Sequence, residues 1–230
     1  MNPLINDTFI APPCQESLGI VYEDESLLVI NKPSGLLSLS GKNPANLDSV
    51  HHRLVQQWPT AQLIHRLDFG TSGLLVVALS QDIAKALNRQ FQQRQVTKRY
   101  FAMLQGLVDA DCGLIDAPIG KDPLHFPKVK ICSVTGKPAL TEYAVIERFP
   151  EQETTLVAYT PLTGRTHQLR IHSAHIGHPI LGCDLYGTTE TKTRASRLLL
   201  QACDLSFIHP VSGEALSFRQ ALEGAFDSCL

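Results

Sequence analysis

Runs of hydrophobic residues bounded by glycine, proline or polar turns divide the chain into predicted strands. The clearest run covers 74–79, follows Gly73 and contains only apolar residues. A short apolar run of this kind, bounded by a turn, is typical of a strand that is buried on both faces. Residues 27–30 form a second such strand, which ends at the turn-prone segment 31–35.

Alternating polar and apolar positions predict a hairpin farther along the chain. Residues 139–147 and 154–160 alternate in this way, as expected of two strands that each expose one face. Two closing strands, 197–208 and 214–218, flank a turn that contains proline and glycine. Another strand is expected over 98–104.

A four-residue spacing of apolar side chains predicts a helix over about 81–94. Ile83, Leu87 and Phe91 share this spacing and would form the buried face of the helix. Ser80 precedes them and is expected to cap the helix, because its hydroxyl can accept a hydrogen bond from a free N–H of the first turn.

A second helix is expected over 166–176, with Thr163 or Thr166 as its cap and Gly177 as its end. A third helix is expected within 47–57. Many strands with a few interspersed helices predict an α+β fold with a mixed, mostly antiparallel sheet.

Composition and charge are those of an ordinary globular protein. The 230 residues are 43% hydrophobic and 18% charged, which is enough for one sizeable core. The net charge is −2, yet residues 26–202 hold 19 basic and 13 acidic side chains, because acidic residues gather towards both ends. A locally positive surface is sufficient for phosphate binding, so this balance is compatible with a nucleic-acid partner.

The first 18 residues show little periodicity, and we expect a loose N-terminal arm ahead of a single domain over 19–222 without a separate N-terminal RNA-binding domain. The chain has no signal-peptide pattern and no apolar run of about twenty residues, so we expect a cytoplasmic protein without a membrane span. Six scattered cysteines without a Cys-x-x-Cys pair argue against a disulfide framework or a thiolate zinc site.

The strongest chemical signal is the segment 65–78, which reads HRLDFGTSGLLVVA. Asp68 lies between a basic pair, His65 and Arg66, and a Gly-Thr-Ser-Gly turn that leads into the predicted buried strand. A loop fixed to the core at one end presents a reactive group rigidly. An aspartate before such a turn is also ordinary turn chemistry, in which the side chain caps its own backbone.

Three further segments strengthen the chemical interpretation. They are Asn31–Gly35 (NKPSG), Lys98–Tyr100 (KRY) and Thr163–His172 (TGRTHQLRIH). Together with HRLDFGTSGLLVVA they closely resemble the motifs NKPxG, K-x-Y, TGRxHQLRxH and HRLDxxTSGLLVVA of the RluA-type RNA pseudouridine synthases. The resemblance runs from about residue 20 to residue 219.

This resemblance implies a fold and an activity. The fold would be the pseudouridine synthase catalytic fold, with helices and loops around a central cleft. The activity would be isomerisation of uridine to pseudouridine in 23S rRNA, tRNA or both. No cofactor is implied, because the isomerisation involves neither a redox change nor a group donor, and the chain has no dinucleotide fingerprint or P-loop.

The resemblance also implies a catalytic set. Asp68 would be the catalytic carboxylate, Arg165 would pair with it, and Tyr100 would lie against the bound uracil. A neighbouring guanidinium would keep Asp68 ionised and nucleophilic. A carboxylate can attack the sugar carbon, stabilise positive charge on it, or help to remove a sugar proton, and the residues leave these routes open.

Five residues form the predicted substrate-binding set. Arg66 would fill the space left by the flipped uridine, because a guanidinium stacks on bases and pairs with phosphates. His65 would support the loop or contact the RNA backbone, and Leu169 would line the base pocket. Arg170 and Lys32 complete the set, although for Lys32 a supporting role is favoured over a catalytic one.

Two features leave alternatives open. Residues 85–99 hold five basic residues and no acid, which fits either a solvated helix face or contact with RNA. His167, His172, His175 and His178 invite a metal interpretation, but residues 165–178 contain no acid and no cysteine. We therefore predict no metal site, and expect these histidines to bind backbone groups or phosphate.

The rival interpretation from another class is a catalytically inactive RNA- or ribosome-binding protein of the same fold. The joint presence of Asp68, Tyr100 and Arg165 argues against lost catalysis. A His-rich metallohydrolase is a more distant third interpretation. We expect a monomeric isomerase whose partner is RNA.

Overall fold

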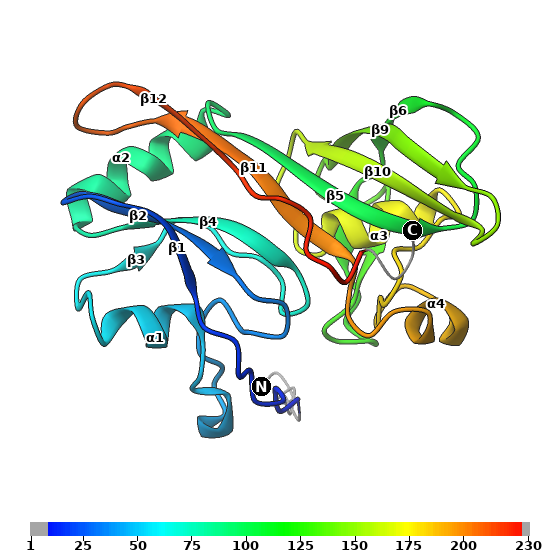
Figure 1. The fold of residues 1–230 in the computed structure, drawn as a ribbon. Coiled ribbons are helices and arrows are strands. Elements are labelled where there is room, and N and C mark those ends of the chain that lie inside the picture. Colours follow the sequence, from blue (N-terminus) through cyan, green and yellow to red (C-terminus); the bar gives the residue numbers. More distant parts are fainter. Residues whose placement is uncertain (1–8, 227–230) are drawn as a thin grey trace. The chain divides into compact units, whose positions relative to one another are not determined.

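The computed structural model describes residues 9–226, which form two compact units (Figure 1). Unit 1 runs to Arg89 and includes Pro210–Ser212, whereas unit 2 comprises Gln90–His209 and the chain from Gly213. The predicted domain over 19–222 spans both units, and its treatment as a single domain stays a prediction. Each unit is described by itself.

Unit 1 is built on an antiparallel sheet in which β2 lies between β1 and β4, and a short β3 also pairs with β4. The strands are β1 (Gly19–Glu23), β2 (Leu27–Lys32), β3 (Gln62–Leu63) and β4 (Ser72–Ala78). All of β4 is buried, as its continuous apolar run predicts. Both predicted strands of this region are confirmed, whereas β1 is not predicted, because it is mostly exposed and lacks an alternating pattern.

Three helical segments accompany this sheet, namely the 3-10 helix η1 (Pro44–Asn46), α1 (Val50–Val55) and α2 (Gln81–Gln92). Ser49 caps α1 by accepting a hydrogen bond from the His52 N–H at 3.1 Å. Ser80 accepts one from the Ile83 N–H at 3.4 Å, as its predicted capping role requires. Both predicted helices are confirmed, and α1 is shorter than the predicted 47–57.

Residues 9–18 carry no helix or strand, but hydrogen bonds fasten them to unit 1. The side chain of Asn46 donates to the Phe9 carbonyl at 2.7 Å and accepts from the Ala11 N–H at 2.8 Å. Arg53 donates to the carbonyl oxygens of Cys14 and Glu16. This segment is therefore held rather than loose, in contrast to the predicted arm, whose residues 1–8 lie outside the described part of the chain.

Unit 2 contains a larger antiparallel sheet in the order β12-β11-β5-β10-β9-β6. Its strands are β5 (Thr97–Gln105), β6 (Cys112–Asp116), β9 (Leu140–Phe149), β10 (Thr154–Pro161), β11 (Leu200–Ile208) and β12 (Ala215–Arg219). The predicted hairpin is β9–β10 and the predicted closing strands are β11 and β12, so these predictions are confirmed.

The segment 109–137 holds more regular structure than its loop-rich sequence indicates. It forms β6, and it also forms a separate two-stranded sheet of β7 (Ile119–Lys121) and β8 (Val129–Ile131). Strands of three residues are too short to show a period, which is why the sequence pattern does not reveal them.

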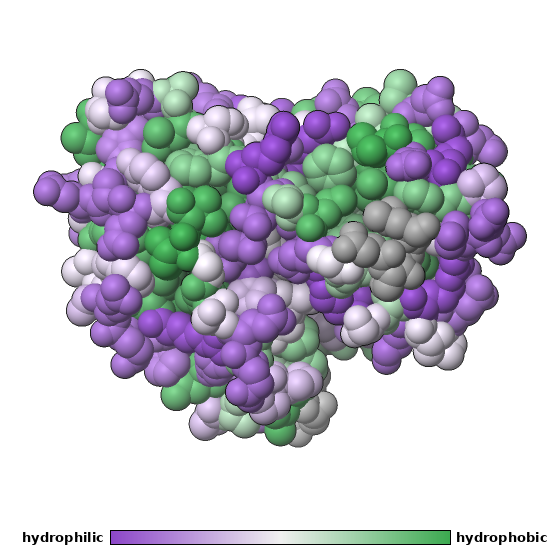
Figure 2. Space-filling view, viewed as in Figure 1, coloured by the Kyte–Doolittle hydropathy of each residue, from purple (hydrophilic) through white to green (hydrophobic). Residues whose placement is uncertain are grey.

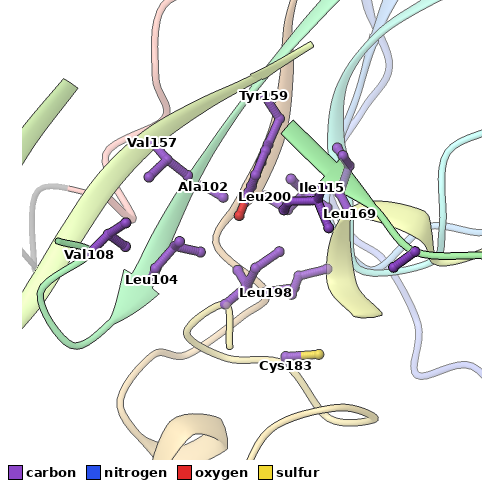
Figure 3. Close-up of a cluster of buried hydrophobic side chains, with 12 residues drawn as sticks. Ala102, Leu104, Val108, Ile115, Val157, Tyr159, Leu169, Cys183, Leu198 and Leu200 are labelled. Carbon is purple, nitrogen blue, oxygen red and sulfur yellow. The ribbon is translucent and has the colours of Figure 1, made fainter. Parts of the chain in front are cut away.

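The core of unit 2 lies between the larger sheet, which contains β5, β10 and β11, and the helix α3 (Gln168–His175). Tyr159 of β10 reaches into a cluster with Ala102, Leu200 and Leu169 (Figure 3). Its hydroxyl is 2.7 Å from the Ser173 hydroxyl, and burial raises the pKa of Tyr159. The ring is therefore a neutral, structural part of the core. A further short helix, α4 (Thr189–Thr193), follows in the same unit.

The ends of α3 show one correct prediction and one wrong one. Gly177 ends the helix in the left-handed conformation with φ of +87°, as expected of a terminating glycine. The N-cap, however, is His167 with φ of +54° and no capping side chain. Thr163 and Thr166 therefore do not cap the helix, and the Thr163 hydroxyl instead donates to Gln168 Oε1 at 2.8 Å.

The surface mixes small apolar patches with hydrophilic side chains over the face in Figure 2. Among the described residues, no helix has the length and apolar character that a membrane crossing requires.

Candidate active site

Asp68 lies in a loop of unit 1 that leads directly into β4, and we call residues 65–71 the Asp68 loop. Its backbone forms a turn in which the Thr71 N–H donates to the Asp68 carbonyl at 3.1 Å. The Asp68 side chain is half-buried. Within the described residues of unit 1, no side chain pairs with its carboxylate, so the turn is held by backbone and the carboxylate stays available.

A second segment, residues 32–38, holds the Asp68 loop on both sides of the aspartate, and we call it the brace. On the N-terminal side, the Ser38 hydroxyl donates to the Leu67 carbonyl at 2.6 Å and accepts from the Leu67 N–H at 3.2 Å. On the C-terminal side, Gly35 N–H donates to the Phe69 carbonyl at 2.9 Å. The hydroxyl of Ser34 donates to the Gly70 carbonyl at 2.7 Å. The loop is therefore fixed at three positions around Asp68, one before it and two after it.

Gly35 is needed for this arrangement, because its φ of +73° lies in the left-handed region that other residues enter at a cost. This explains physically why the NKPSG turn requires a glycine at its end.

Lys32 is the central support of the brace. Its side chain is 0% exposed, and its ammonium donates to the carbonyl oxygens of Pro33, Leu36 and Phe69 at 2.8, 2.7 and 3.2 Å. Hydrogen bonds to three carbonyl dipoles compensate a buried cation. The side chain of Lys32 has no exposed surface that RNA could contact. The prediction that Lys32 contacts the substrate is therefore corrected, and we assign it a role in supporting the Asp68 loop.

The two basic residues before Asp68 have different environments. His65 is half-buried, and its Nε2 accepts a hydrogen bond from the Val76 N–H of β4 at 3.3 Å. This contact ties the start of the loop to the core and fits the supporting role that the sequence indicates. Arg66 is exposed, as a residue that meets RNA has to be.

In unit 2, Tyr100 lies on β5 directly opposite Tyr159 of β10. It is half-buried and packs against the core cluster beneath α3. Its ring is therefore fixed on one side by the core while part of it remains accessible, which is the condition for stacking on a base.

Arg165 lies in the loop between β10 and α3, and Gln168 organises this loop. The Gln168 carbonyl oxygen accepts hydrogen bonds from the Thr163 hydroxyl and the Arg165 N–H, while its amide donates to the Leu140 carbonyl and the Thr141 hydroxyl. The Arg165 guanidinium donates through Nε to the Pro138 carbonyl at 3.0 Å. Gln168 is a site residue that was not predicted, although its place in the motif TGRTHQLR was a signal.

Leu169 and Arg170 are buried. Leu169 belongs to the core cluster shown in Figure 3. Arg170 is 4% exposed, forms an ion pair with Asp184 and lies over the ring of Tyr186 at 5.6 Å. The prediction that Arg170 contacts the substrate is therefore corrected, because its guanidinium is used inside unit 2.

The four histidines near α3 have separate environments. His172 is buried between the Thr141 hydroxyl and the Ala117 carbonyl, and burial lowers its pKa. His167 bonds the Tyr186 hydroxyl, His178 bonds the Gln105 carbonyl, and His175 is exposed. Over residues 9–226 no group of three or more His, Cys, Asp or Glu side chains could hold a metal ion.

The predicted catalytic and substrate-binding residues are thus divided between the units. Asp68, His65, Arg66 and Lys32 belong to unit 1, and Tyr100, Arg165, Leu169 and Arg170 belong to unit 2. The structure orders each group within its own unit, and the pairing of Asp68 with Arg165 stays a prediction.

Comparison with known proteins assigns the family. The RNA pseudouridylate synthase family matches residues 26–175, which include the brace, the Asp68 loop and all of α3. The chain is 44% identical over 208 residues to "Dual-specificity RNA pseudouridine synthase RluA" of Escherichia coli (strain K12), covering 90% of this chain and 94% of the relative. It is 46% identical over 200 residues to the protein of that name from Yersinia pestis, covering 87% and 97%.

A solved structure agrees with this assignment. "Human RNA Pseudouridylate Synthase Domain Containing 1" is 31% identical, with a TM-score of 0.77 and coverage of 95% of this chain and 89% of the human chain. The motifs, the family match over most of the chain and the curated relatives point the same way. This chain belongs to the RNA pseudouridylate synthase family and is an isomerase.

Proposed function

We propose that Asp68 is the catalytic carboxylate with which this enzyme converts uridine to pseudouridine within RNA. The observation that carries the proposal is the fixation of the loop at Leu67, Phe69 and Gly70, which leaves the Asp68 carboxylate without a partner inside unit 1. A protein that only needed a turn here would not require backbone contacts on both sides of one acidic residue.

The chemistry follows from the carboxylate. The bond between C1′ of the ribose and N1 of uracil breaks, the uracil turns, and a bond forms between C1′ and C5. C5 then loses its proton to solvent, and N1 gains a proton, so that the product is an isomer of the substrate. Asp68 acts on the ribose, either by attacking its anomeric carbon or by removing a sugar proton. Arg165 pairs with Asp68 and stabilises its charge, and Tyr100 supports the uracil ring while it turns.

Arg66 supports flipping of the target nucleotide. Extrusion of a base costs a few kcal/mol. The exposed guanidinium of Arg66, two residues before Asp68, can occupy the vacated space and stack on the neighbouring bases. Leu169, a buried residue of the core cluster against which Tyr100 packs, is proposed to line the base pocket.

The proposed substrates are 23S rRNA, tRNA or both, since curated relatives are named dual-specificity enzymes. We further propose that the enzyme acts as a monomer in the cytoplasm, where these RNAs mature.

The test is release of tritium from RNA labelled at uridine C5. The Asp68→Asn variant is expected to reduce release to background while it still binds RNA, because the side chain keeps its size and loses its charge. Asp82→Asn is the matched control, since Asp82 is a solvent-exposed carboxylate of α2. Normal turnover by Asp68→Asn would end the assignment.

The same assay distinguishes an active pseudouridine synthase from a catalytically inactive RNA-binding protein of the same fold. A wild-type protein that binds unmodified rRNA and tRNA but releases no tritium from either would be an RNA-binding protein of this fold.

A further inference from the structure

A pocket of about 390 Å³ lies wholly within unit 2. It is formed by the end of α2, the turn that follows, the start of β5 and the loop 160–165. This volume falls in the range of sites that hold a small organic ligand. Its principal lining residues are Phe91, Arg94, Thr97, Lys98, Thr163 and Arg165.

The pocket is cationic and has no carboxylate in its lining. Arg94, Lys98 and Arg165 all contribute to it, and none of the three forms an ion pair with another described residue. Mutual repulsion of like charges makes such a cluster costly in an empty protein. An anionic ligand would remove this cost.

Lys98 is a partly buried lysine of this pocket. Its side chain is half-buried, and burial lowers its pKa, because desolvation disfavours the ammonium ion. The buried Lys32 of unit 1 is compensated by three carbonyl oxygens, whereas no hydrogen bond of the Lys98 ammonium is found within the described residues. Lys98 is therefore a partly desolvated cation that has no anionic partner among the described residues of unit 2, which suits it to an anionic ligand.

The pocket also offers an apolar surface beside these cations. Phe91 contributes its ring, over which Lys98 Nζ stands at 5.7 Å from the centroid, and Val96, Pro161 and Leu162 add apolar area. A free phosphate has no use for such a surface, and an acidic side chain has no flat face to fill it. A nucleotide has both a charged phosphate and an apolar base.

Arg94 adds an independent observation. Its φ is +57°, in the turn that ends α2, where the Arg94 N–H donates to the Phe91 carbonyl and Gln95 N–H to that of Gln90. Glycine or asparagine usually occupies this position, because a side chain there costs about 1 kcal/mol. A strained arginine lining a pocket points to a role in binding rather than in stability.

We propose that this pocket binds a nucleotide of the substrate RNA that adjoins the target uridine, with its phosphate against Arg94 and Lys98 and its base against Phe91. The proposal rests on the proposed function, because Arg165, which we pair with Asp68, also lines the pocket. In this proposal Lys98 of the K-x-Y motif and Arg94, which lies four residues before it, both contribute to RNA binding.

The test compares two variants with a matched control. Lys98→Gln removes the desolvated charge, and Arg94→Gly removes the guanidinium while relieving the positive φ. Lys192→Gln is the control, since Lys192 is an exposed lysine of α4 outside the pocket. Affinity for unmodified, transcribed rRNA fragments and tRNA is measured over a range of salt concentrations, with thermal melting as the check of folding.

Lys98→Gln is expected to weaken RNA binding roughly tenfold, as expected for loss of a charge-assisted hydrogen bond. The slope of log affinity against log salt should fall by about 0.7 for each lost phosphate contact. Arg94→Gly should melt at the same or a higher temperature than wild type and still bind RNA more weakly. This opposition of stability and binding cannot arise from a purely structural role.

Folded Lys98→Gln and Arg94→Gly proteins that bind RNA with wild-type affinity and salt dependence would overturn the proposal. A loss of equal size in Lys192→Gln would overturn it too, since it would reveal a general charge effect. Absence of tritium release by the wild-type enzyme would instead count against the proposed function, while the binding comparison would still decide the role of the pocket.

Discussion

The brace of unit 1 and the cationic pocket of unit 2 each contain a lysine whose side chain is wholly or partly buried. Lys32 is fully buried, and three carbonyl oxygens surround its ammonium. Lys98 is half-buried beside two arginines and has no anionic partner among residues 9–226. The difference shows that the role of a basic residue is decided by its partners. A buried cation with hydrogen-bond acceptors around it stabilises the fold, whereas one without an anionic partner is available to bind an anionic ligand.

The largest expected effect comes from removing the compensated cation. Lys32→Met would leave the carbonyl oxygens of Pro33, Leu36 and Phe69 buried without their shared donor. We expect the free energy of unfolding to fall by about 3 kcal/mol, because unsatisfied buried polar groups cost about 1–3 kcal/mol each. Chemical denaturation measures this change. A loss below that of an ordinary surface substitution would break the comparison.

The next largest effect concerns the loop that carries Arg165. The neutral side chain of Gln168 holds this loop through hydrogen bonds. Gln168→Ala would remove its hydrogen bonds to Thr163, Arg165 and the start of β9. We expect a loss of about 2 kcal/mol in unfolding free energy. The kcat for tritium release should fall more than KM changes, because Arg165 loses its position. An unchanged kcat in a folded variant would contradict the positioning role.

A smaller effect of the opposite sign is expected at the uncompensated lysine. Lys98→Met removes a desolvated charge and keeps the aliphatic stem, so the unfolding free energy should stay equal or rise by about 1 kcal/mol. RNA binding should weaken at the same time. A clear destabilisation would show that Lys98 has a structural partner like that of Lys32.

The smallest effect is a dependence of stability on pH through His172. This side chain is buried, like that of Lys32, and its burial favours the neutral imidazole. Its folded-state pKa is lowered from the ordinary 6.5, with His175 acting in the same direction and Asp116 in the opposite one. The unfolded chain therefore binds the proton more readily, and the contribution of His172 is fully present above pH 6.5 and is lost as the pH falls below it.

The loss cannot exceed about 1.4 kcal/mol for each pH unit below 6.5. Unfolding measured between pH 7.5 and pH 5.5 tests this, since the slope should be shallower in His172→Asn than in wild type. Equal slopes in the two proteins would remove His172 from the account.

The predicted elements were correct where local pattern alone decides structure. The apolar run of β4, the four-residue spacing of α2 and the alternation of β9 and β10 each carry their own period, so they are visible before folding. The short β7 and β8 and the exposed β1 lack such a period. They form because the next strand along the chain supplies their hydrogen-bonding partner, β2 for β1 and β8 for β7.

The site shows the same division. The types and spacing of Asp68, Tyr100 and Arg165 are visible in the motifs, and they led to the correct family. Burial is not visible there, so Lys32 and Arg170 were placed on the RNA although both are inside the protein. Gln168 and Ser38 were missed for the same reason, since Leu140 and Thr141, which Gln168 joins to its loop, and Leu67, which Ser38 binds, lie 27 or more residues away.

The sequence by itself determined the family and the reaction and predicted the residues that carry it, because reactive groups and turn-forming residues have to stand in a set order along the chain. Only the tertiary structure decided which of the basic residues are compensated. Carbonyl oxygens surround Lys32 and the Asp184 carboxylate lies beside Arg170, whereas neither is found at Lys98 in the part of the chain that the structure describes. The physical reason is that the cost of a buried charge depends on neighbours in space, and folding brings these neighbours from distant parts of the chain.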